Sequence, residues 1–192
     1  LLGGLLLGPM LVHRGVVQMV VPVFAKNVLG AAEKSAWIVS SSNFGELLGA
    51  LLLLRVLMNT GKGKKPSPFR WIRAMAVGTL AVWALTTGAG LWLILPMILA
   101  MSLAWSANDI SMTSYFQSRL PNESAGKAVG FLMAAELGSI MVVSFMLGLL
   151  FDLLPLNVGF IAVSAALTLL AFVFWRGKTH LKEAAGKEAP KA

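Results

Sequence analysis

The chain has 192 residues, of which 57% are hydrophobic and only 12% are charged, and its mean hydropathy is +0.79. Soluble domains carry roughly a quarter of charged residues, so this composition excludes a water-exposed globular domain. The net charge of +8 would fit nucleic-acid binding in a soluble protein. Here the Lys and Arg residues stand between and after apolar runs, as in the cytoplasmic loops of membrane proteins. We therefore expect the lipid bilayer, and no nucleic acid, among the partners.

Apolar runs near 20 residues long recur along the chain, and a helix of that length crosses about 30 Å of hydrocarbon. Six spans are predicted, at Leu1–Phe24, Ala36–Leu57, Trp71–Thr87, Leu91–Tyr115, Lys127–Phe151 and Val158–Trp175. Residues 1–176 would then form an all-α, six-helix transmembrane bundle. Residues 177–192 are basic and are expected to form a disordered tail.

An even number of spans places both termini on the same side of the membrane. Three basic segments fall on that side, namely the loop around Lys62–Lys65, the loop from Arg119 to Lys127, and the tail. Because Lys and Arg are enriched in cytoplasmic loops, that side is predicted to be the cytoplasm. We expect a multi-pass plasma-membrane protein with both termini cytoplasmic, in a bacterial inner membrane.

Five titratable side chains fall deep inside the predicted spans, away from the span ends, where a charged group costs at least about 2.5–3.5 kcal/mol and is a functional candidate by default. They are His13, Arg14, Glu46, Asp109 and Glu136. Depths taken from the helical rise predict that Arg14 pairs with Glu46 and that Asp109 lies near Glu136. One cation then faces three carboxylates, so a carboxylate without a partner is expected to hold a proton, as proton coupling requires.

The alternative is that these groups only bridge helices. We prefer it for Glu46, which Arg14 would neutralise, and for Glu136, which stands among closely spaced glycines. For Asp109 both interpretations stay open. His13 would shuttle protons beside Arg14 or would be a hydrogen-bonded packing residue, which is the commoner role of a single His.

Polar residues on the fourth predicted span follow helical spacing. Ser102, Ser106, Asp109 and Thr113 are separated by four, three and four residues and share one helix face, and Asn108 flanks them. A polar stripe does not face lipid, so it lines a water-filled cavity or a neighbouring helix, and we expect the cavity. With the five titratable groups, these residues form the predicted substrate and proton pathway.

Closely spaced small residues mark two spans. They are Gly45 and Gly49 in the second span, and Gly126, Gly130, Ala134 and Gly138 in the fifth. Because small residues four positions apart let two helix backbones approach, both rows are expected to pack against neighbouring helices, with a dedicated dimer interface as the alternative. The first span is interrupted by Pro9, Gly15 and Pro22, which is typical of a bent helix that lines a cavity.

Enzyme motifs are missing from the sequence. It contains no G-x-S-x-G, H-E-x-x-H or phosphate-binding loop and no Cys. One of its two His residues, His180, falls in the tail, so we expect neither a metal site nor a cofactor. An intramembrane hydrolase is disfavoured, because Ser106 and Asp109 would need a His base within hydrogen-bonding reach.

Three parts of the chain carry a family resemblance. They are Val20–Phe24 with Asn27–Gly30, Gly45–Ala50 with Arg55 and Gly61–Lys65, and Phe116–Lys127. In this order they resemble the seventh span, the eighth span with its cytoplasmic signature, and the loop before the eleventh span of major facilitator superfamily transporters. The drug and macrolide exporters are the most similar. Leu51–Leu54 depart from the pattern, since they replace the acidic residue usual before the signature's arginine.

The resemblance implies a C-terminal half-transporter whose six helices form two inverted three-helix repeats, with the first and fourth spans lining a central cavity. It implies proton-coupled export of small amphipathic molecules by alternating access. Because one half does not alternate access alone, the implied partner is an N-terminal six-helix half, missing from this chain, or a second copy. The alternative is a non-transporting six-helix membrane scaffold or assembly protein, in which the buried carboxylates only bridge helices.

Overall fold

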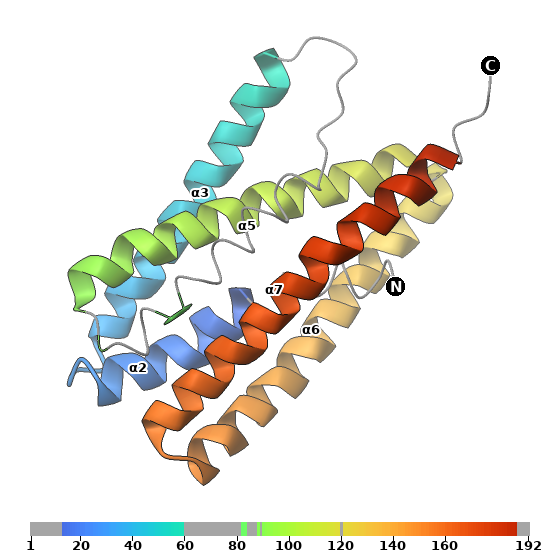
Figure 1. Ribbon diagram of the computed structural model, residues 1–192. Coiled ribbons are helices and arrows are strands. Elements are labelled where there is room, and N and C mark those ends of the chain that lie inside the picture. The colour runs from blue at the N-terminus through green and yellow to red at the C-terminus, as the bar shows by residue number, and fades with distance from the viewer. Residues whose placement is uncertain (1–12, 60–81, 84–87, 89, 120, 188–192) are drawn as a thin grey trace.

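The computed structural model describes residues 13–59, 82–83, 88, 90–119 and 121–187 (Figure 1). Its elements are the π-helical η1 (Val16–Val20) and the α-helices α2 (Val21–Asn27), α3 (Lys34–Asn59), α5 (Leu91–Arg119), α6 (Asn122–Leu153) and α7 (Leu156–Lys187). The predicted all-α fold is confirmed for these residues. Most of the predicted third span and the start of the first span lie outside them, so the six-span count and the inverted repeats stay predictions.

Three of the helices are long and apolar enough to cross a membrane. The segments are Lys34–Arg55, Leu91–Ser111 and Val129–Leu153, and α7 adds the shorter apolar stretch Leu156–Leu169. Large apolar side chains stand exposed on these helices, including Trp92 at 87%. Water would disfavour such a surface, whereas hydrocarbon does not. The described residues are therefore suited to a bilayer.

Helices α3 and α5 form the tightest contact in the described part of the chain. Successive contacts join residues 54 positions apart: Ser41 with Leu95, Gly45 with Leu99, and Gly49 with Leu103. A Cβ atom added at Gly45 would overlap the Leu99 carbonyl oxygen, so only glycine permits this approach. The constant offset means that the two helices run in the same direction. The end of α3 and the start of α5 therefore lie at opposite ends of the helix pair, and in a bilayer they would lie on opposite faces.

The helix before α3 departs from regular α geometry. Residues Val16–Val20 form a π-helical segment, and α2 follows with Pro22 in its first turn. Proline lacks an N–H donor, and its ring clashes with the carbonyl four residues earlier. A wider π-helical turn accommodates both effects, and such segments often occur at functional sites. The π-helical segment lies between Gly15 and Pro22, two of the three predicted interruptions; Pro9 lies outside the described residues, and a bent helix stays a prediction.

The apolar core lies where this first helix meets α5 and α7. It includes Val20, Phe24, Ile98 and Phe160, all nearly inaccessible to solvent. The Phe24 and Phe160 rings meet edge to face, with centroids 5.8 Å apart, which adds a specific aromatic contact to the apolar burial. Two of these elements, the first helix and α5, also hold the site described below.

Helices α6 and α7 form an antiparallel hairpin that turns at Leu154 and Pro155 (Figure 1). At its tip, Gly159 lies against the Phe151 ring, where an added Cβ would come within 2.8 Å. The small-residue row of α6 behaves differently from the prediction. Gly126, Gly130, Ala134 and Gly138 are exposed, and nothing lies within 4 Å of a Cβ added at any of the three glycines. The expected packing of this row is therefore wrong for the described residues, because their neighbours contact other faces of α6.

The C-terminal end also differs from the prediction. Helix α7 continues to Lys187, so residues 177–187 are helical rather than part of a disordered tail. The segment contains Ala, Lys and Glu residues, which are strong helix formers. Residues 188–192 lie outside the described part of the chain.

Candidate functional site

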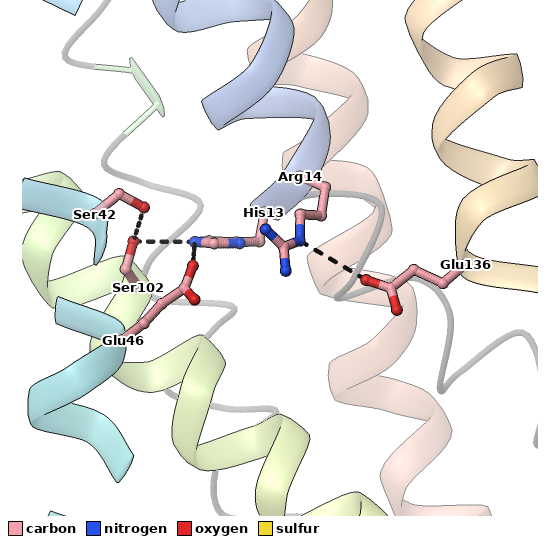
Figure 2. Close-up of polar contacts among 6 residues, drawn as sticks. All are labelled: His13, Arg14, Ser42, Glu46, Ser102 and Glu136. Atoms are coloured by element: carbon pink, nitrogen blue, oxygen red, sulfur yellow. Dashed lines mark hydrogen bonds and ion pairs between the residues drawn. The ribbon is translucent and has the colours of Figure 1, made fainter. Parts of the chain in front are cut away.

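Two consecutive side chains of the first helix, His13 and Arg14, organise a polar cluster between the helices. Neighbouring residues on a helix point about 100° apart, so the two reach different partners. Figure 2 shows the His13 ring directed toward α3 and α5, and the Arg14 guanidinium directed toward Glu136 on α6. The cluster thereby joins four helices of the bundle through two adjacent residues.

The His13 side of the cluster is a chain of short polar contacts. His13 Nε2 lies 3.0 Å from Ser102 Oγ, which is 2.7 Å from Ser42 Oγ. The same Nε2 is 3.7 Å from Glu46 Oε1. The ring is fully buried and stacks on Trp105, with centroids 5.2 Å apart and planes inclined by 10°. This confirms His13 as a hydrogen-bonded packing residue, and its contact with Glu46 leaves a proton-handling role open.

On the other side of the cluster, Arg14 forms an ion pair with Glu136. Arg14 Nε lies 3.8 Å from Glu136 Oε1, and the two side chains are 39% and 16% exposed. The predicted pairing of Arg14 with Glu46 is therefore wrong, since Glu46 faces His13 instead. The physical reason is helix rotation: depth along the axes places both glutamates within reach, but the direction of each side chain selects the partner.

Asp109 completes the group of charged residues predicted to lie within the spans. It is half-buried on α5. The positive charge of Arg14 attracts its carboxylate, as well as those of Glu46 and Glu136. The charge of Asp109 in turn repels those of both glutamates, and its predicted place near Glu136 stays a prediction. Within the described ranges, Asp109 makes neither a hydrogen bond nor an ion pair. One cation thus faces three carboxylates, as the sequence predicted.

The polar stripe of α5 divides into two parts. Ser102 is buried against Ser42 of α3, and the Ser106 Cβ lies 3.1 Å from the position of a Cβ on Gly49. These two serines face a neighbouring helix, so the predicted water-filled cavity is wrong for them. Glycine packing brings α3 too close to leave space for water. Asp109 and Thr113, further along the stripe, are half-buried.

Asn108 was predicted to flank the stripe and belongs to a different face of α5. It is 1% exposed, and its Oδ1 has no hydrogen-bond partner among the described residues, as is also the case for Ser111 Oγ three positions later. We therefore separate Asn108 from the cluster around His13 and Arg14.

Sequence reasoning missed Ser42 and Trp105 as members of the cluster. Both were detectable from helical spacing, because Ser42 precedes Glu46 by four residues and Trp105 follows Ser102 by three. A search for aromatic and hydroxyl side chains on the same face as each buried charge would have found them.

The cluster contains titratable groups and a hydroxyl beside an imidazole. Ser102 and His13 resemble a nucleophile and its base, but both are fully buried. His13 Nδ1, where an orienting carboxylate would bind, has no partner in the described residues. No group of three or more His, Asp or Glu side chains there is placed to bind a metal ion.

Comparisons with family models, with curated proteins and with solved structures find no match to this chain. The chemistry of the cluster and its place within apolar helices are therefore the grounds for a function. Glu46 and Ser102 lie near the middle of the segments Lys34–Arg55 and Leu91–Ser111, the two helices best packed among those suited to crossing a bilayer.

Proposed function

We propose that this chain is a six-helix half of a secondary transporter that couples proton movement to the export of small amphipathic molecules. The observation that carries the proposal is a cluster of ionisable side chains among apolar helices. In it Arg14 pairs with Glu136, and His13 contacts Glu46. Ionisable residues at such depth are costly and commonly mark ion or substrate pathways. The resemblance to major facilitator superfamily exporters in three segments of the sequence supports the same class.

The proposed coupling depends on competition for Arg14. One guanidinium neutralises a single carboxylate well and three carboxylates poorly. The remaining negative charge favours proton binding from the side of the membrane to which the cluster is open. Movement of the first helix against α6 would change the distance between Arg14 and Glu136, and Asp109 would then gain or lose the influence of the cation. The π-helical segment beside Arg14 suits such a movement, because irregular helical turns allow local adjustment.

A partner is part of this proposal. Alternating access requires two bodies that rock about a shared site, so a second six-helix half, or a second copy of this chain, would enclose the cluster. The substrate would bind between the two halves. Both termini would face the cytoplasm of a bacterial inner membrane, as the basic segments predict.

A non-transporting membrane scaffold is the second candidate, and one observation favours it. The close polar contacts of the cluster all bridge neighbouring helices, as Ser42 with Ser102 and Arg14 with Glu136 do. In a scaffold these contacts would serve only to fix helix positions. The two candidates differ in whether Asp109, which bridges no helices, needs a titratable side chain.

The test is a transport assay in proteoliposomes that contain the full protein as it is produced in cells. An imposed pH gradient should drive movement of ethidium, a fluorescent amphipathic cation. Asp109→Asn keeps the volume of the side chain and removes its proton exchange, so it should abolish gradient-driven movement while leaving the fold intact. Glu136→Gln should also reduce transport, because it removes the ion-pair partner of Arg14.

The matched control is Asp152→Asn, an equivalent substitution at an exposed residue near the end of α6, which should leave transport unchanged. Full gradient-driven transport by the Asp109→Asn variant would remove Asp109 from the coupling mechanism. Absence of gradient-driven movement for ethidium and for neutral and anionic amphipathic dyes, with well-folded protein, would favour the scaffold.

A further inference from the structure

An apolar cavity of about 420 Å³ lies between η1, α6 and α7, apart from the polar cluster. Its lining is entirely apolar: Gly15, Val16, Val20, Val143, Met146, Leu147, Leu150, Ala162, Val163, Ala166 and Leu167. A volume of this size falls within the range of ligand-binding pockets, about 300–1,000 Å³. The cavity is open on one side, so a molecule of matching shape is able to enter it.

The depth of the cavity places it in one leaflet of the bilayer. Leu150 and Val143 lie about 4 and 15 Å from the end of α6 at Leu153, by the helical rise. Ala162 and Leu167 of α7 lie at similar distances from the same turn. Because the hydrocarbon core is about 30 Å thick, the cavity spans the acyl region of the leaflet on the side of the α6–α7 turn.

The apolar lining of the cavity determines which kind of molecule it is able to bind. Water does not fill an apolar cavity, since it would lose its hydrogen bonds. An amphipathic drug-like molecule would bring a polar or charged group, and no lining residue offers that group a partner. The polar atoms of an occupant must therefore lie outside the cavity, in the interfacial region beyond the helix ends.

Access from the lipid is provided between α6 and α7. Met146 is 61% exposed, and Ala166 on α7 is exposed as well, although both line the cavity. An occupant therefore enters sideways from the hydrocarbon rather than from water.

We infer that the cavity binds the acyl chain of a membrane phospholipid from the leaflet on the side of the α6–α7 turn. Its headgroup remains at the membrane surface beyond Leu154 and Pro155. The chain fills the space between the first helix and the α6–α7 hairpin, directly beside Gly15 and thus next to Arg14. This inference concerns lipid binding and does not depend on the proposed transport.

The test uses the full chain in nanodiscs made with phosphatidylcholine that carries a diazirine near the end of one acyl chain. After illumination, labelled residues are mapped by mass spectrometry of peptides. Labels should concentrate on Met146, Leu147 and Ala166, and they should be scarcer on Phe131 and Met133, which are exposed on the same α6 helix outside the cavity.

Ala166→Trp fills the cavity and should lower labelling of Met146 and Leu147 about tenfold, because a filled volume admits no chain. The matched control Met133→Trp adds the same ring on the exposed face and should leave that labelling unchanged. If Ala166→Trp fails to fold, Ala162→Leu is the smaller filling variant, with the same expected direction.

Two outcomes would overturn the inference. Equal labelling of the cavity and of Phe131, unaffected by the filling variant, would mean that lipid contacts the protein only at its periphery. Displacement of the label by ethidium, at unchanged labelling of Phe131, would assign the cavity to a small amphipathic molecule instead of a lipid chain.

Discussion

The α3/α5 pair and the α6/α7 hairpin carry glycines at the same four-residue spacing, and the two regions use them differently. Gly45 and Gly49 of α3 lie directly against the backbone of α5, so closely that no Cβ atom fits. Gly130 and Gly138 of α6 have no atoms within 4 Å of an added Cβ. Small residues four positions apart thus allow a second helix to approach closely, but the close contact forms only where a second helix lies alongside.

Polar contacts follow the same division. The α3/α5 pair is also joined by Ser41 donating to the Leu95 carbonyl at 2.7 Å and by the contact between Ser42 and Ser102. The described part of the α6/α7 hairpin instead borders an apolar cavity. One pair is a rigid support for the polar cluster, whereas the other leaves room beside the first helix. A bundle that must move would separate rigid and yielding parts in this way.

The largest expected effect comes from filling the tight pair. Gly45→Leu should lower the free energy of unfolding in detergent by about 3 kcal/mol or more, because the added side chain meets backbone atoms of α5 that do not move aside. Gly138→Leu should change it by less than about 0.5 kcal/mol, as expected for an exposed position. Thermal or SDS-induced unfolding of the purified chain measures both.

A strong loss of stability for Gly138→Leu would contradict the comparison at once. If the loss appears only when the protein is isolated together with a partner, the exposed row of α6 is a contact with that partner. In that case the glycine row of α6 would also be packed, but against a second chain instead of a helix of this chain.

A smaller effect is expected at the junction of the two regions, where Arg14 meets Glu136. Arg14→Gln should destabilise the chain by about 1–2 kcal/mol, which is less than for a fully buried pair because Arg14 is 39% exposed. The same substitution at Arg55, exposed near the end of the α3 span, should cost no more than about 0.5 kcal/mol.

A double-mutant cycle tests the partner of Arg14. The coupling energy between Arg14→Gln and Glu136→Gln should be about 1 kcal/mol, whereas Arg14→Gln and Glu46→Gln should be closer to additive. A larger coupling energy between Arg14 and Glu46 would support the pairing expected from helix depth alone. Arg14 would then belong to the α3/α5 region.

The third effect concerns the hydrogen bonds of Ser102, which lies within the α3/α5 pair. Ser102→Ala removes the hydroxyl that joins His13 to Ser42, and the two partners remain buried. The expected loss is about 1–2 kcal/mol, the cost of leaving a buried polar group unsatisfied. Ser40→Ala, at an exposed position of α3, is the control, and an equal loss there would show that the hydrogen bonds of Ser102 contribute nothing specific.

The smallest effect on stability is expected from single cysteines, which the natural sequence lacks. Exposed positions Ala32, Gly90 and Asn157 lie at the same end of the helices, and Ser124 lies at the opposite end. A membrane-impermeant maleimide should therefore label the first three from one side of the membrane and Ser124→Cys from the other. Labelling of Ala32→Cys and Gly90→Cys from different sides would contradict the parallel packing of α3 and α5.

Local features of the chain were predictable because they depend on residues near in sequence. Helix α3 and helix α5 were expected within a few residues of their observed ends, since apolar runs of spanning length and their polar boundaries are visible directly. The irregular first helix followed from Pro22, whose missing donor is a covalent fact. The set of charges around Arg14 followed from counting ionisable residues inside apolar runs.

Contacts between helices were predicted less well, for a physical reason. Axial rise gives the depth of Glu46 and Glu136 relative to Arg14, but the rotation of each helix about its axis decides which carboxylate the guanidinium meets. The same holds for the polar stripe, where Ser102 and Ser106 turned out to face α3.

By itself, the sequence of this protein determined an all-helical chain with helices suited to hydrocarbon, and one cation set among three carboxylates. These properties follow from hydrogen bonds between residues four apart and from the cost of each side chain in lipid, both of which are local. Only the tertiary structure decided that Arg14 meets Glu136, that His13 holds Ser102, and that one glycine row is packed while the other is exposed. Such choices depend on helix rotation and on which neighbour lies alongside, and no local pattern encodes them.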